Sequence, residues 1–77
     1  MSFTAETKYW EGQCDLSPRQ LEVLQHISCG HSNREIADLL GISEHTVKRH
    51  VRWVALKLGA NTRAQSVAIA FHRSLLP

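Results

Sequence analysis

The strongest constraint on this chain is a repeated pattern of helix start and stop signals. Three times, a serine or threonine is followed three residues later by glutamine or glutamate, which predicts a capping box at a helix start. The pairs are Ser17 with Gln20, Ser32 with Glu35, and Thr62 with Gln65. Ser43 opens a fourth amphipathic stretch. Glycines at positions 30, 41 and 59 are expected to end three of these four stretches. The pattern predicts four helices and almost no strand.

Apolar spacing predicts which side of each helix is buried. The second helix, between Ser32 and Gly41, is expected to bury Ile36, Leu39 and Leu40. The third, residues 44–58, is expected to bury Val47, Val51, Val54 and Leu58. The fourth runs from Thr62 to about Leu76, with Val67, Ala70 and Ser74 toward the core. Short joints then predict a compact all-α, four-helix domain.

The joint between the second and third helices is only Gly41, Ile42 and Ser43. A three-residue turn with glycine is the length used where two helices meet at roughly 90–120° in a helix-turn-helix. In that motif the first helix braces the second, which enters a DNA groove. The joint therefore predicts that the second and third helices form a helix-turn-helix.

The third helix carries its positive charge opposite its apolar stripe. His45, Lys48, Arg49 and Arg52 project to the side away from Val47 and Val54, while His50 lies at the edge of the buried stripe, where we favour packing. Residues 1–42 hold three basic and six acidic side chains, a net −3, whereas residues 43–77 hold six basic and one acidic, a net +5. This local charge favours an anionic partner, and we expect double-stranded DNA.

Length and composition exclude other classes. A chain of 77 residues makes one small domain with little volume for an enzyme cavity, and no strand-turn-helix elbow holds a nucleophile. The five histidines and two cysteines lack metal-ligand spacing, so we expect no metal, no cofactor and no catalytic residue. Without a signal peptide or membrane span, the expected location is the cytoplasm. Residues 1–14 show no helical period and are expected to form an N-terminal arm or interdomain linker before a domain at 15–77.

The chain also resembles a known family. The segments LSPRQLEVLQHISCGHSNREIADLLGISEHTVKRHV and KLGANTRAQSVAIA are similar to the LuxR-type (FixJ-type) DNA-binding domain of bacterial transcription regulators. The resemblance implies sequence-specific DNA binding for transcription regulation and a fourth helix that pairs two copies on a two-fold related site. KLGANTRAQSVAIA resembles the lactone-responsive, quorum-sensing branch more closely. Double-stranded DNA, a second copy of the chain and RNA polymerase are the expected partners.

Site residues follow from matching this family position by position. The residues that match base-contacting positions are Lys48, Arg49 and Arg52. Those expected to contact the DNA backbone lie at two helix starts and are Ser32, Asn33, Ser43, His45 and Thr46. Trp53 and Leu56 depart from the family pattern, in which polar and basic residues are common, and suggest that the far end of the helix packs on the arm or on another domain.

The fourth helix carries a second apolar stripe beside its core side. The stripe is expected to form the dimer contact and consists of Ala64, Ala68, Phe71 and Leu75. Two alternatives stay open: a promoter-binding module like region four of sigma factors, which acts as a monomer, and a helical protein-interaction domain. A small-residue fourth helix argues against the first, and strong salt-sensitive DNA affinity would argue against the second.

Overall fold

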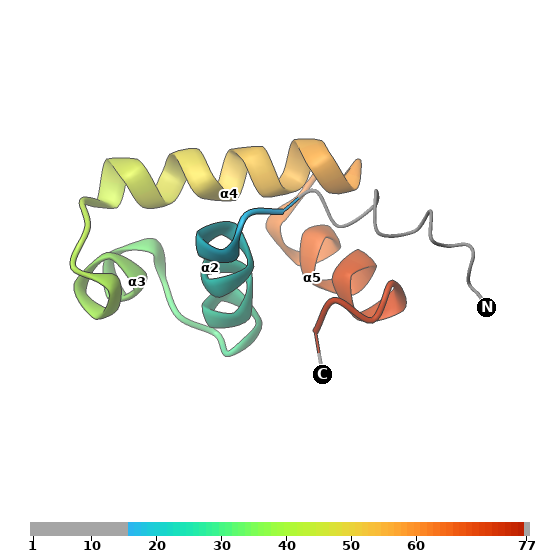
Figure 1. Cartoon of the computed structure of the whole chain (residues 1–77), viewed down its shortest axis with the longest axis horizontal. Helices are drawn as coiled ribbons and strands as arrows, with labels where there is room; N and C mark the ends of the chain where they lie inside the picture. Colours follow the sequence, from blue (N-terminus) through green and yellow to red (C-terminus); the bar gives the residue numbers. More distant parts are fainter. Residues whose placement is uncertain (1–15, 77) are drawn as a thin grey trace.

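The computed structural model describes residues 16–76, and this part of the chain is helical apart from its ends and the joints between helices. Its helices are α2 (Pro18–Ser28), α3 (Asn33–Leu40), α4 (Glu44–Leu58) and α5 (Arg63–His72). The longest helix, α4, lies across the other three, with α3 under one end, α2 under the middle and α5 under the other end (Figure 1). For residues 16–76, the predicted all-α, four-helix architecture is confirmed. The arm predicted for residues 1–14 lies outside the described residues.

Serine caps begin three of these helices as the sequence predicts. The Ser17 hydroxyl accepts from the Gln20 N–H at 3.1 Å, and the Gln20 side chain accepts from the Ser17 N–H at 3.1 Å. Ser32 and Glu35 form the same reciprocal pair at 3.1 and 2.8 Å. Ser43 caps α4 by accepting from the Thr46 N–H at 3.0 Å. Each cap satisfies N–H groups that lack a partner within the helix, which stabilises the helix start by about 1 kcal/mol.

The cap of α5 differs in one detail from the prediction. Thr62 accepts from the Gln65 N–H at 3.0 Å, as expected. The Gln65 side chain, however, accepts from the N–H of Asn61 instead of that of Thr62. The extended backbone of Thr62, with φ −136°, differs from the φ near −70° of the serine caps. The cap is therefore present without the reciprocal bond of a full capping box.

Two buried clusters form the core, and α2 and α4 contribute to both. One cluster joins α2, the end of α4, α5 and the C-terminal residues, and consists of Leu16, Leu24, Val54, Leu58, Ala70 and Leu76. The other joins α2, α3 and the start of α4, and consists of Val23, Ile27, Ile36, Ala37 and Val47. Because α4 is held by one cluster at each end, its rotation about its own axis is fixed along its whole length.

Two packing predictions, for Leu39 and Ser74, and one predicted helix end are wrong. Leu39 is 57% exposed, and Ala37 takes the buried position on α3 instead, because an eight-residue helix presents only a narrow side to its neighbours. The last helix ends at His72, not near Leu76. Ser74 is exposed in a left-handed turn with φ +59°, which directs Leu76 back into the core.

Candidate nucleic-acid interface

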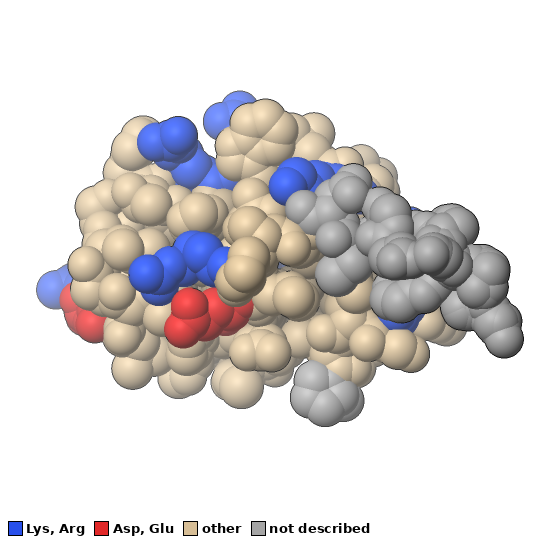
Figure 2. Space-filling model, in the orientation of Figure 1, with Lys and Arg blue, Asp and Glu red and all other residues tan. Residues whose placement is uncertain are grey.

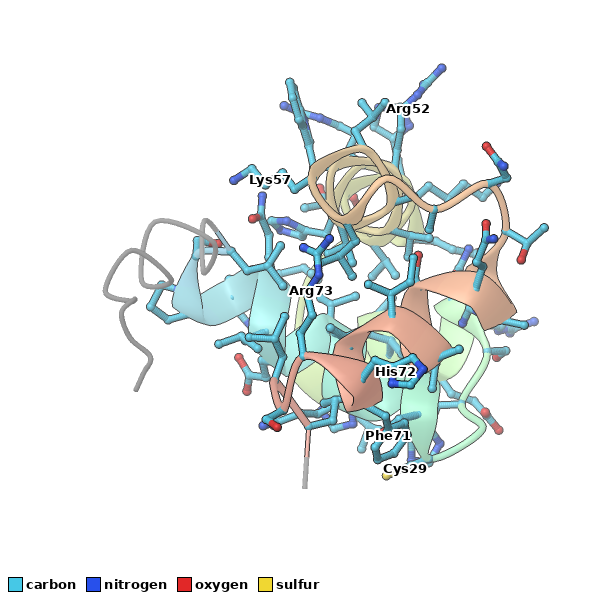
Figure 3. The ribbon with its side chains drawn as sticks, turned by 90° about the vertical axis from the view of Figure 1, so that its right-hand side faces the viewer. Cys29, Arg52, Lys57, Phe71, His72 and Arg73 are labelled. Carbon is cyan, nitrogen blue, oxygen red and sulfur yellow. The ribbon has the colours of Figure 1, made fainter. Side chains whose placement is uncertain are left out.

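The exposed side of α4 carries the three residues predicted to contact bases. Val47 and Val54 are fully buried on the opposite side, so Lys48, Arg49 and Arg52 are all exposed. Seen along the helix axis, Arg52 points away from the body of the molecule (Figure 3). The helix therefore presents these cations on one outward face, and no other helix within residues 16–76 covers them.

The turn before α4 is held by two kinds of contact. Gly41 ends α3 in the left-handed conformation with φ +68°, which a side chain at this position would strain. The Ile42 N–H then donates to the Ala37 carbonyl at 3.1 Å, and the Ile42 side chain packs on the cluster that contains Val47. These contacts fix how α3 braces α4, as the helix-turn-helix prediction requires.

The residues predicted to contact the DNA backbone lie at the starts of α3 and α4. Ser32, Ser43 and His45 are exposed, and Asn33 and Thr46 are half-buried. The hydroxyls of Ser43 and Thr46 are 2.9 Å apart and share one hydrogen bond. Since one proton serves that bond, the second hydroxyl proton of the pair is available for an acceptor such as a phosphate oxygen.

Charge is unevenly distributed over the surface. Figure 2 shows lysine and arginine side chains along the edge formed by α4, and further basic side chains lower on the molecule, next to the acidic side chains visible in this view. Glu35 belongs to a capping box, and the hydrogen bond from the Ser32 backbone is the main cause that lowers its pKa. Arg19 pairs with Glu22 at 3.4 Å on α2. Glu22 and Glu35 thus have local partners on α2 and α3, while Glu44 is the acidic residue in the first turn of α4 itself.

His50 lies at the boundary between the core and the exposed side of α4. It is half-buried, as its position at the edge of the apolar stripe predicts. Burial is the main cause that lowers its pKa below the ordinary value of 6.5, and the charges of Arg19 and Arg49 lower the pKa further. The neutral imidazole is therefore the favoured form in the folded domain.

The last turns of α4 carry apolar side chains on the surface. Trp53 is 50% exposed and Leu56 is 65% exposed. The contact predicted for them with the N-terminal arm falls on residues outside the described range. Within residues 16–76, both side chains remain largely open to solvent.

The predicted dimer stripe is only partly helical. Ala64 and Ala68 are exposed on α5, and Phe71 is 49% exposed. Phe71 lies on the side of the molecule opposite Arg52 (Figure 3). Leu75 lies beyond the end of the helix and packs partly against the cluster that contains Leu16. The prediction that Leu75 continues the helical stripe is therefore wrong, because the chain turns at Ser74.

One residue near the site was missed by the sequence analysis. Arg63 begins α5, and its guanidinium donates to the Asn33 side-chain oxygen at 2.6 Å and to the His31 carbonyl at 2.8 Å. These bonds join α5 to the start of α3 across 30 and 32 residues of sequence. The available signal was that a cation at a first helical position opposes the helix dipole, so another contact has to favour it.

Other kinds of site find little support among the described residues. No group of three or more histidine, cysteine or acidic side chains in that range is placed to hold a metal ion. An open hollow of about 300 Å³ on α3 is lined by His31, Glu35, Asp38 and Leu39. None of the described helices has the length and apolarity needed to cross a membrane.

Comparisons with known proteins identify a family for most of the chain. Residues 15–70 match the model of the bacterial regulatory proteins of the luxR family. The transcriptional activator RamA of Corynebacterium glutamicum is 45% identical over 62 residues, which cover 80% of this chain and 22% of that protein. A probable transcriptional regulatory protein, NarL of Mycobacterium tuberculosis, is 46% identical over 61 residues, covering 79% and 28%.

A solved structure agrees with these matches. The response regulator ChrA of a heme-sensing two-component system is 41% identical with a TM-score of 0.77, and the match covers 79% of this chain and 30% of that chain. The chain thus spans between about a fifth and a third of the length of these relatives.

Proposed function

The chain belongs to the luxR family of bacterial regulatory proteins, and from this we propose that it binds a two-fold related DNA site as a homodimer, with α4 of each copy in the major groove. Membership of the family makes it a DNA-binding domain of transcription regulation. The proposal concerns how it binds: which residues read bases, which contact phosphates, and which surface pairs two copies.

The observation that carries the proposal is the outward cationic face of α4. The major groove is about 12 Å wide and admits one helix, and arginine or lysine can bond to guanine O6 and N7 there. Lys48, Arg49 and Arg52 are exposed on this face, opposite the buried Val47 and Val54. We assign base recognition to these three cations.

Backbone contacts orient the helix in the groove. Two helix starts offer N–H groups and a favourable dipole to phosphates. The side chains proposed to contact the backbone are Ser32, Asn33, Ser43, His45 and Thr46. The Ser32 hydroxyl accepts in its capping bond, so its proton remains available to a phosphate oxygen. At the start of α4, Ser43 and Thr46 share one hydrogen bond, and one of their two hydroxyl protons remains available.

Pairing of two copies is assigned to the exposed side of α5. Ala64 and Ala68 allow close helix approach, and Phe71 supplies apolar area at the same side. Leu75 is half-buried in its own domain and contributes at most the edge of such a contact. A contact this small is weak away from DNA, so cooperative binding to a palindrome is the appropriate measurement.

Selection of bound sequences from a random DNA pool tests the recognition mode. We expect enrichment of a palindrome whose half-sites lie one helical turn apart, ~34–36 Å. Enrichment of one unrepeated sequence would instead favour the monomeric, sigma-like alternative. Absence of any enriched sequence, with weak and salt-insensitive binding, would favour the protein-interaction alternative.

Ala68→Glu tests the dimer surface. In a two-fold contact it places like charges against each other, so cooperativity on the palindrome should be lost. Gln25→Glu, at an exposed position of α2, makes a comparable addition of negative charge away from this surface and should leave cooperativity unchanged. A folded Ala68→Glu variant that binds the palindrome as cooperatively as the parent would eliminate the α5 contact.

The input that controls binding is a separate proposal. ChrA and VraR of Staphylococcus aureus are named as response regulators. These names favour an output role in phosphorylation-controlled regulation over the lactone-responsive branch preferred from sequence. We further propose that the chain acts in the cytoplasm with the bacterial chromosome, and that RNA polymerase is a partner of the regulator on DNA.

A further inference from the structure

We propose that Arg63 is a positioning residue for DNA: it turns the side-chain amide of Asn33 so that its NH2 group faces a DNA phosphate. This inference rests on the proposed function, because it assumes that the start of α3 meets the DNA backbone. It assigns a role in DNA binding to a residue of α5 that lies outside the helix-turn-helix.

The contacts of Arg63 span the beginning of α3. Its guanidinium bonds to the His31 carbonyl, which lies just before the N-cap Ser32, and to the side chain of Asn33, which lies just after it. Both bonds are short, at 2.8 and 2.6 Å, and both are partly buried. A planar guanidinium can serve two acceptors at once in a fixed geometry, which a lysine cannot reproduce.

The chemistry of this pair fixes the orientation of the amide. Arginine carries only N–H donors and no acceptor, so the part of Asn33 that faces it must be the carbonyl oxygen. The NH2 group of Asn33 then points away from Arg63 and keeps its two donors. Without Arg63, either end of the amide could face outward, and the outward oxygen would repel a phosphate.

Arg63 also has a cost that this role would explain. A cation at the first position of a helix faces the positive end of the helix dipole of α5. The same guanidinium lies beside the start of α3, where it adds positive charge to a helix end that already favours anions. The added positive charge favours a phosphate at the start of α3.

A double-mutant cycle tests whether Arg63 acts through Asn33. The affinities of the parent, Arg63→Ala, Asn33→Ala and the double variant are measured on a random-sequence DNA duplex of about 20 base pairs, long enough for two half-sites one turn apart. Arg63→Ala in the parent should weaken binding on the order of tenfold. In the Asn33→Ala background it should have only the smaller effect of losing one charge.

The cycle separates the effect of Arg63 on the orientation of Asn33 from the effect of its charge on DNA affinity. The charge is lost in both backgrounds, so its effect cancels when the two losses of affinity are compared. Equal losses in the two backgrounds would overturn the proposal. Circular dichroism and thermal unfolding of all four proteins restrict the comparison to folded protein. A bond that only stabilises the fold would couple the two residues in unfolding and not in the DNA affinity of folded protein.

Asn33→Asp separates the two roles of Asn33 by another route. The carboxylate still accepts from Arg63, so the variant should be at least as stable as the parent. It has no NH2 donor, so binding of the same duplex should weaken at least as much as in Asn33→Ala. Parent-like affinity of Asn33→Asp would overturn the proposal.

Failure of this inference is distinguishable from failure of the proposed function. If the parent binds the duplex and Arg52→Ala loses preference for the selected site, the major-groove proposal stands whatever the cycle gives. If the parent fails to bind DNA at all, both the proposed function and this inference are overturned.

Discussion

The two halves of α4 share one buried stripe and differ on their exposed side. In the first turns the exposed side chains include Lys48 and Arg49, and Arg52 follows one turn later. In the last turns the exposed side chains include Trp53 and Leu56, which are 50% and 65% open to solvent. The same helix therefore gains exposed apolar side chains toward its end, where Lys57 is its exposed cation, while its core contacts continue.

This difference shows how little of an exposed surface is fixed by folding. Val47 in the first half and Leu58 in the second are set by the two core clusters, because a polar residue there would lose its hydration. The exposed positions of α4 make few contacts within the domain, so the fold does not determine which residue types occupy them. We therefore base DNA recognition on the first half and assign no recognition role to the second.

Leu58 and Leu56 offer the sharpest contrast, since the same residue type lies two positions apart on one helix. Leu58 is 3% exposed and Leu56 is 65% exposed. Leu58→Ala should lower the free energy of unfolding by about 2–5 kcal/mol, because it removes buried methyl groups and leaves a cavity. Leu56→Ala should change it by less than about 0.5 kcal/mol. Urea unfolding of both variants provides the measurement.

A large destabilisation by Leu56→Ala would mean that this side chain is covered in the intact chain. The apolar end of α4 would then be a packing surface. The two halves of α4 would differ in how far their outer side chains are buried as well as in charge. Parent-like stability of Leu58→Ala would contradict the core described here.

Salt dependence tests whether the cationic half meets phosphates. A domain that neutralises several phosphates should lose on the order of a hundredfold in affinity between about 50 and 200 mM salt. Because Lys48 is assigned to a base, Lys48→Ala should change the slope of the log–log plot by less than about 1, and Trp53→Ala should leave it unchanged. Titrations of a fluorescent duplex at several salt concentrations give these slopes. A flat response of the parent would instead support a protein partner.

Arg52 lies between the cationic and the apolar part of the exposed side of α4. Its replacement tests recognition of bases. Arg52→Ala should cost about 1–3 kcal/mol on the preferred site and leave non-specific binding nearly intact. Leu56→Ala, one turn further along the same exposed side, should cost less than about 0.5 kcal/mol on that site. Equal loss on all sequences would make Arg52 a phosphate contact. A loss at Leu56 as large as that at Arg52 would extend recognition into the apolar half.

Local signals predicted much of this fold. Helix starts and stops depend on neighbouring residues, so the sequence reveals them directly. They include the caps at Ser17, Ser32 and Ser43 and the left-handed glycines at 41 and 59. The bounds of α4, Glu44–Leu58, agree with the prediction for the same reason. The exposed positions of Lys48, Arg49 and Arg52 follow from helical periodicity once the buried stripe is known.

Features that depend on tertiary contacts were harder to predict. The sequence predicts a later end for α5 than the structure has, because the turn at Ser74 depends on the packing of Leu76 in a core formed by distant residues. Periodicity predicts a buried Leu39 because it shows the apolar side of a helix but not how much of that side the neighbouring helices cover. The bond from Arg63 to Asn33 joins residues 30 positions apart, and no local pattern identifies its partner.

His50 lies between the buried and exposed sides of α4 and gives the smallest expected effect. Its pKa is lowered in the folded domain, mainly by burial and further by the charges of Arg19 and Arg49. The unfolded chain therefore binds a proton more readily, and the stability that His50 contributes is present above its ordinary pKa of 6.5 and falls as the pH drops below that value. His50→Gln should remove this part of the pH dependence of unfolding. Urea unfolding of parent and variant on both sides of pH 6.5 measures how the difference in their stability depends on pH. If that difference stays the same over this range, the pKa of His50 is not lowered by folding.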